Sequence, residues 1–202
     1  DEPFDHFNRV GFKLFQQVLH RKAVTFFSWM LASGVSGLYQ LSVRKCEDRR
    51  SAAIAGQGLK ASLLLAFALC AALYACKGPY LAFMAPGEAI SAYCRQYLTW
   101  YPVLAALQSV GMLLLYLVFV RGGQLVCVKA YAIQLIANVA LSYELCERFG
   151  MSGISLGTAV SYLVWLLVMT ALLRGDDSCP RFARARLDLA LLVRAAKSSF
   201  EE

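Results

Sequence analysis

Amide side chains and a hydroxyl lie within the apolar stretches of this chain and could line a binding site. The stretches hold no Asp or His, and their one carboxylate, Glu144, lies near the end of its stretch. Ionisable residues inside a membrane usually carry ions or substrates, so the sequence offers no obvious ion-coupling group. A polar group within an apolar span should face protein or a wet cavity and not lipid. The candidate binding residues are Gln40, Gln57, Gln108, Gln134, Asn138 and Ser142.

The composition is typical of a membrane protein. Of the 202 residues, 59% are apolar and 16% are charged, and the mean hydropathy is +0.54. Soluble domains average about 45–50% apolar and about 25% charged residues. The helices of a soluble core carry a polar stripe, whereas the run from residue 104 to 120 has only Gln108 and Ser109 as strongly polar members. We therefore predict an all-α, polytopic helical membrane protein.

Five apolar stretches have close to the ~20 residues that a helix needs to cross a hydrocarbon core of about 30 Å. Charged junctions separate them, and a charged segment precedes the first. We predict an N-terminal segment over 1–22, a membrane helical lobe over 23–174 and a linker or tail over 175–202. The predicted spans are 23–43, 52–76, 97–120, 125–146 and 152–173. The junctions are 44–50, 77–95, 121–124 and 147–151.

The segment 1–22 is too charged to span a membrane. Its aromatic residues recur at roughly helical spacing, which fits an amphipathic helix at the membrane interface and equally a helix packed against the lobe. It contains no signal-peptide apolar core. Two interpretations stay open: the chain is a piece of a longer protein, or it lacks a normal first span.

Basic residues predict the orientation of the spans. Most of them lie in the junction 44–50, around 121–129 and in the tail, while the opposite side holds Lys77, Arg95 and Arg148. The positive-inside rule places the richer side in the cytoplasm. The cations of segment 1–22 go against this pattern. The formal net charge of +7 is scattered around the spans, which argues against nucleic acid as a partner.

Metal and enzyme chemistry find no support in the motifs. The seven cysteines show no pair at metal-binding spacing, and small apolar packing is the better interpretation of those inside spans. Asp176 and Asp177 have no second aspartate pair, which favours a solvated turn over a magnesium site. No hydrolase, kinase or dinucleotide signature is present. We expect no enzyme activity, no metal and no cofactor.

Short motifs follow each other in a characteristic order. They comprise a Gly/Ser-rich helix end, a basic turn, an Ala-rich helix start, an acidic outer loop, an Asn-containing helix and a Gly-rich helix start. The segments are Ser33-Gly34-Val-Ser-Gly37, the turn 44–50, Ala52-Ala53, the loop 81–90 before Tyr97-Leu98, Ala137-Asn138-Val-Ala-Leu141-Ser142-Tyr143, and Gly150-Met-Ser-Gly153-Ile-Ser-Leu-Gly157-Thr158-Ala-Val-Ser161-Tyr162.

This ordered set resembles one six-helix lobe of the multidrug and toxic compound extrusion (MATE) family, over roughly residues 28–174. The resemblance implies spans 2 to 6 of one lobe, with the tail as the linker before the next lobe. It implies export of small organic compounds by alternating access between two lobes, coupled to sodium or proton entry, in a bacterial plasma membrane. The related polysaccharide-exporter and lipid-flippase branches share this architecture and remain alternatives.

Three departures from the family pattern affect the expected function. The first family span, which often carries a Pro and a functional Asp, is absent or degraded. The family's Asp after Asn-Val-Leu is Ser142 here, and a second lobe is missing. The sequence favours Asn138 as a staple between helices over a substrate contact. The partners we expect are the bilayer, a small organic substrate and a second lobe or second copy; a non-transporting membrane subunit or gene fragment is the rival interpretation.

Overall fold

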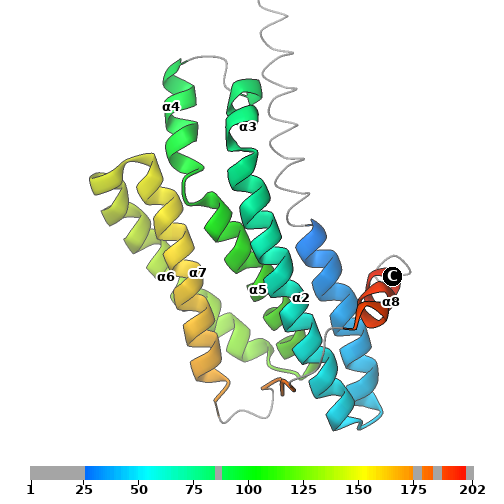
Figure 1. Cartoon of the computed structure of the whole chain (residues 1–202). Coiled ribbons are helices and arrows are strands. Elements are labelled where there is room, and N and C mark those ends of the chain that lie inside the picture. Colours follow the sequence, from blue (N-terminus) through cyan, green and yellow to red (C-terminus); the bar gives the residue numbers. More distant parts are fainter. Residues whose placement is uncertain (1–25, 85–87, 175–178, 184–187, 199–202) are drawn as a thin grey trace, which may run out of the picture.

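The computed structural model describes residues 26–84, 88–174, 179–183 and 188–198, and all regular secondary structure within these ranges is helical (Figure 1). A first helix covers residues 26–44, counted from the first described residue. The helices that follow are α2 (Asp48–Ala75), α3 (Lys77–Met84), α4 (Glu88–Tyr97), α5 (Tyr101–Val120), α6 (Gln124–Phe149), α7 (Met151–Leu172) and α8 (Leu189–Ser198).

Four of these helices, α2, α5, α6 and α7, are long and apolar enough to cross a membrane. The prediction of a polytopic helical membrane protein is therefore confirmed, and the chain is an integral membrane protein. The helix of residues 26–44 lies on the first predicted span, whose beginning falls outside the described residues. The predicted N-terminal segment 1–22 lies outside them entirely, as do Asp176 and Asp177.

The predicted junction 77–95 is more ordered than the sequence predicted. Its residues form two short helices, α3 and α4, and only Cys76 separates α3 from the end of α2. Pro79 lies in the first turn of α3, where the missing N–H has no intrahelical partner to lose. Tyr97 ends α4, so the predicted start of the next span was four residues early: α5 begins at Tyr101, with Pro102 in its first turn.

The α6–α7 hairpin is packed backbone against backbone. Gly150 connects the two helices with φ 60, a conformation that favours glycine. A methyl group at Gly153 would overlap the carbonyl oxygen of Leu145, and one at Gly157 would press on the backbone of Ser142. Small residues therefore allow the close approach of this pair, as they do widely in membrane helices.

Helix α5 lies at the centre of the bundle and packs on both sides. Its residues Leu113 and Leu117 join a buried cluster with Tyr39 of the first helix, while Val118 joins a second cluster with Trp165 of α7. Gly111 leaves room for the Trp165 ring, which a Cβ there would meet at 2.6 Å. The two clusters make α5 the element that holds the lobe together.

Three buried serines connect the helices inside the bundle. The hydroxyls of Ser28 and Ser109 are 2.6 Å apart, and Ser62 donates to the Ser109 carbonyl at 2.9 Å. Ser109 also bonds the carbonyl of Ala105 one turn back. The first helix, α2 and α5 are thus joined by polar bonds away from water.

The side chains that point outward are largely apolar. On α6, exposed Leu135, Ile136 and Val139 cover a face with little contact to the rest of the chain. In a soluble protein such a surface would be an aggregation site. On a membrane helix it is the surface that meets hydrocarbon.

Candidate functional site

A polar pair lies half-way along two adjacent membrane helices. The amide nitrogen Nε2 of Gln108 on α5 donates to the Tyr162 hydroxyl on α7 at 2.9 Å. At 1.5 Å per residue, Gln108 lies about 4 Å from the midpoint of α5 and Tyr162 within about 1 Å of the midpoint of α7. Both side chains therefore lie near the middle of helices that are long and apolar enough to cross a membrane.

Gln108 is exposed in the single chain although it lies in the middle of an apolar helix. One of its amide hydrogens bonds Tyr162, which leaves a second hydrogen and the carbonyl oxygen of the amide to be satisfied. Hydrocarbon cannot satisfy them. The position is therefore suited to a wet cavity, a ligand or a second protein surface.

A second polar pair lies on α6. The hydroxyl of Ser142 donates to the Oδ1 atom of Asn138 at 3.1 Å, and both residues are half-buried. Ser142 also lies where Gly157 of α7 makes its closest approach. The bond runs within one helix, so the hypothesis that Asn138 bridges two spans stays a prediction.

The other predicted site residues do not join these pairs through any described bond. Gln57 is buried in α2, and its Oε1 atom lacks a hydrogen-bond partner among the described residues. Gln134 is buried on α6, while Gln40 is exposed near the end of the first helix. The six candidates are thus spread over the bundle, and Gln108 has the geometry most favourable for a ligand.

Two relevant residues were missed by sequence reasoning. Tyr162 was noted only as part of a motif, although a tyrosine hydroxyl in mid-span needs a partner. Lys60 lies in the second predicted span and is exposed on α2. It was not among the predicted site residues, yet a cation within an apolar stretch is itself a strong signal.

The basic end of the bundle has a fixed cation. Arg121, in the turn after α5, donates from Nε to the Tyr39 hydroxyl at 2.6 Å, and its guanidinium carbon lies 5.9 Å from the centre of the Tyr39 ring. Tyr39 is fully buried. The contact attaches the α5–α6 turn to the first helix by a hydrogen bond and a cation–π interaction.

Comparison with known proteins adds no relative to these observations. No protein-family model, no curated protein and no solved structure matches this chain. Within the described ranges, no group of three or more His, Cys, Asp or Glu residues is arranged to hold a metal ion. The chemistry open to the mid-span pair is hydrogen bonding and contact with the Tyr162 ring.

Proposed function

We propose that the chain forms one lobe of an export transporter of the MATE type, which moves small organic compounds by alternating access coupled to sodium or proton entry. The ordered motifs of residues 28–174 support this proposal, as does a bundle of apolar helices with polar groups at mid-depth. The transporter is completed either by a second copy of this chain or by a separate lobe.

The observation that carries the proposal is the exposed Gln108–Tyr162 pair. Transporters of this general kind bind their substrates near the bilayer midplane, between two repeats that move against each other. An exposed amide at that depth is costly in lipid and useful in a substrate site. The Tyr162 ring adds a surface that attracts organic cations.

One observation favours the rival function, a non-transporting membrane subunit. Glu144, the carboxylate within the predicted spans, forms an exposed ion pair with Arg148 near the end of α6. It is therefore not placed as a buried ion-coupling group. Under our proposal the coupling ion is bound with the help of the second lobe or by neutral oxygens. A polysaccharide- or lipid-exporting branch would use the same lobe with a different substrate.

The first prediction tests the substrate site. The chain is placed in lipid nanodiscs, and binding of the fluorescent cation ethidium is followed by anisotropy. We expect saturable binding that Gln108→Leu weakens about tenfold, the factor that corresponds to about 1.4 kcal/mol for a lost amide contact. The matched control is Thr170→Val on α7, because the Thr170 hydroxyl is exposed but bonds carbonyls of its own helix.

If the wild-type chain and the Gln108→Leu variant bind ethidium equally well, Gln108 does not contact the ligand. Absence of saturable binding in both would reject an organic-cation substrate and favour the subunit interpretation. If Thr170→Val weakens ethidium binding as much as Gln108→Leu does, the loss reflects a general effect of the α7 surface.

A further inference from the structure

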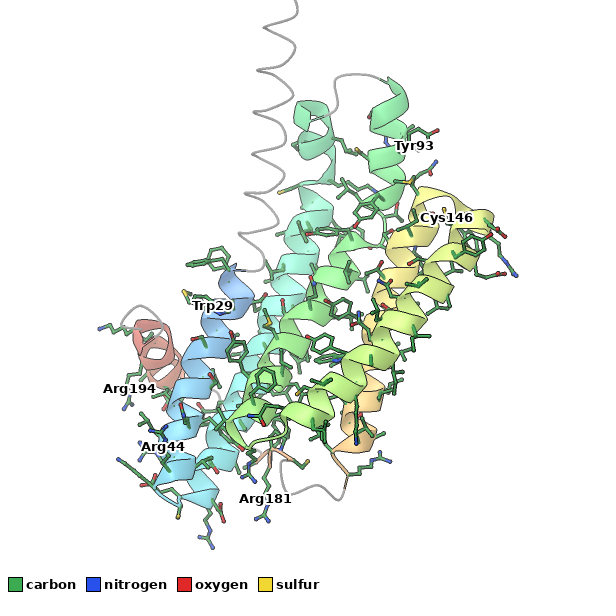
Figure 2. The ribbon with its side chains drawn as sticks, turned by 180° about the vertical axis from the view of Figure 1, so that it is seen from behind. Trp29, Arg44, Tyr93, Cys146, Arg181 and Arg194 are labelled. Carbon is green, nitrogen blue, oxygen red and sulfur yellow. The ribbon has the colours of Figure 1, made fainter. Side chains whose placement is uncertain are left out.

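After α7 the chain returns across the basic end of the bundle. Residues 179–183, which we name the strap, lie at this end, and Figure 2 shows Arg181 of the strap at the same end as Arg44. Cys179 packs against the buried cluster to which α5, α6 and α7 contribute, and Pro180 is buried. One end of the strap is therefore anchored to the half of the bundle that contains α6 and α7.

The other end of the strap is held by the backbone of α2. The Ala183 amide donates to the Ala52 carbonyl oxygen at 2.9 Å. The Ala183 carbonyl oxygen lies where a side chain of Gly56 would begin, so a methyl group at Gly56 would overlap it. Ala52 and Gly56 are one turn apart on the same face of α2. Together they form a seat for the backbone of Ala183.

The strap connects two groups of helices that lie on either side of α5. Residues of α2 join the first buried cluster together with Tyr39 of the first helix, whereas residues of α6 and α7 join the second. α5 contributes to both clusters. Beyond the strap, Leu191 of α8 packs against the first cluster. The chain after α7 therefore touches both groups, and the strap leads from one to the other.

The strap is suited to leave its seat while the helices stay folded. Residues 179–183 have no regular secondary structure, so their release breaks no hydrogen bond inside a helix. Between the two held ends, Arg181 and Phe182 are exposed. Segments with few buried apolar contacts open at a much lower free energy than the helices of a core.

From this arrangement we propose that the strap is a releasable latch at the basic end of the lobe. In the closed state described here, it covers Gly56 of α2 and shields Cys179. In the open state it exposes both residues, while α5 keeps the two groups of helices together. The latch does not depend on which compound the lobe transports, or on whether it transports one.

The test measures how fast a water-soluble maleimide modifies Cys179, by mass spectrometry of the chain in lipid nanodiscs. The wild-type Cys179 should react more slowly than the exposed Cys46. Ala183→Pro removes the N–H that bonds the Ala52 carbonyl. It should accelerate the reaction about fivefold, the change in an opening equilibrium that corresponds to one lost hydrogen bond. Gly56→Ala should accelerate it at least as much, because the added methyl group displaces the Ala183 carbonyl oxygen.

Two control variants match these substitutions. Ala183→Ser keeps the N–H, and Gly78→Ala adds a methyl group that meets nothing within 4 Å, so Cys179 should react at the wild-type rate in both. Cys127 is buried in the second cluster and reports on unfolding of the helices themselves. If Ala183→Pro or Gly56→Ala leaves the Cys179 rate unchanged, the seat does not hold the strap and the proposal is wrong. If either variant accelerates Cys127 as much as Cys179, the strap is part of the core and is not a separate latch.

Discussion

At the scale of single residues, the buried hydroxyls are the groups on which stability depends most directly. Ser28, Ser62 and Ser109 join three helices at a depth where water does not replace a lost partner. The sequence could place these serines in apolar stretches but could not pair them. Their partners are 47 and 81 residues apart in the chain, so only the packing of the helices brings them together.

Ser109→Ala should destabilise the lobe by about 0.6–1.7 kcal/mol, from the average to the largest value found for hydrogen bonds between membrane helices. The change removes the bond between the Ser28 and Ser109 hydroxyls but keeps the carbonyl that Ser62 uses. Unfolding in detergent by increasing denaturing surfactant measures the loss. Ser155→Ala is the control, since this buried hydroxyl bonds the carbonyl of Ser152 in its own helix. An equal loss in both variants would contradict a role of the three-helix junction.

At the scale of elements, the sequence predicted the membrane helices well and the segments between them poorly. Long apolar runs leave little choice but a spanning helix, and α5, α6 and α7 match the predicted spans apart from a few end residues. The junction before α5 was different. Its charged ends, Lys77 and Arg95, marked it as a junction between spans, yet most of it folds into the short helices α3 and α4.

The prediction at this scale concerns the close packing of α6 against α7. Gly157→Ala should destabilise the hairpin by about 1–3 kcal/mol, because the added methyl must push the α6 backbone away at Ser142. The same unfolding assay checks it. Gly78→Ala on α3 is the matched control: a Cβ there meets nothing within 4 Å, so that variant should be neutral or slightly more stable. A stable Gly157→Ala variant would mean that the helices are less closely packed than described.

At the scale of the whole molecule, the candidate site was predictable only in part. The sequence identified polar residues in apolar spans, because hydrocarbon makes any such residue stand out. It could not show that Gln108 meets Tyr162, that Asn138 meets Ser142, or that Gln57 is buried elsewhere. These contacts depend on how each helix is rotated about its own axis. A helix that is apolar on all sides does not specify that rotation. For the same reason, the contact of residues 179–183 with α2 was not predicted.

We predict that this 202-residue chain alone does not transport. Alternating access needs two lobes that move about a shared site near the midplane, and the chain supplies one. A second copy could supply the other lobe. Each copy, however, would contribute only one carboxylate within the predicted spans, Glu144, which is paired with Arg148 at an exposed position. The assay is uptake or efflux of ethidium by liposomes that contain the purified chain, under an imposed proton or sodium gradient. We expect no gradient-dependent movement above that of protein-free liposomes. Gradient-driven transport would contradict this prediction and indicate that copies of this chain complete the transporter, and Glu144→Gln would then show whether that carboxylate couples the ion.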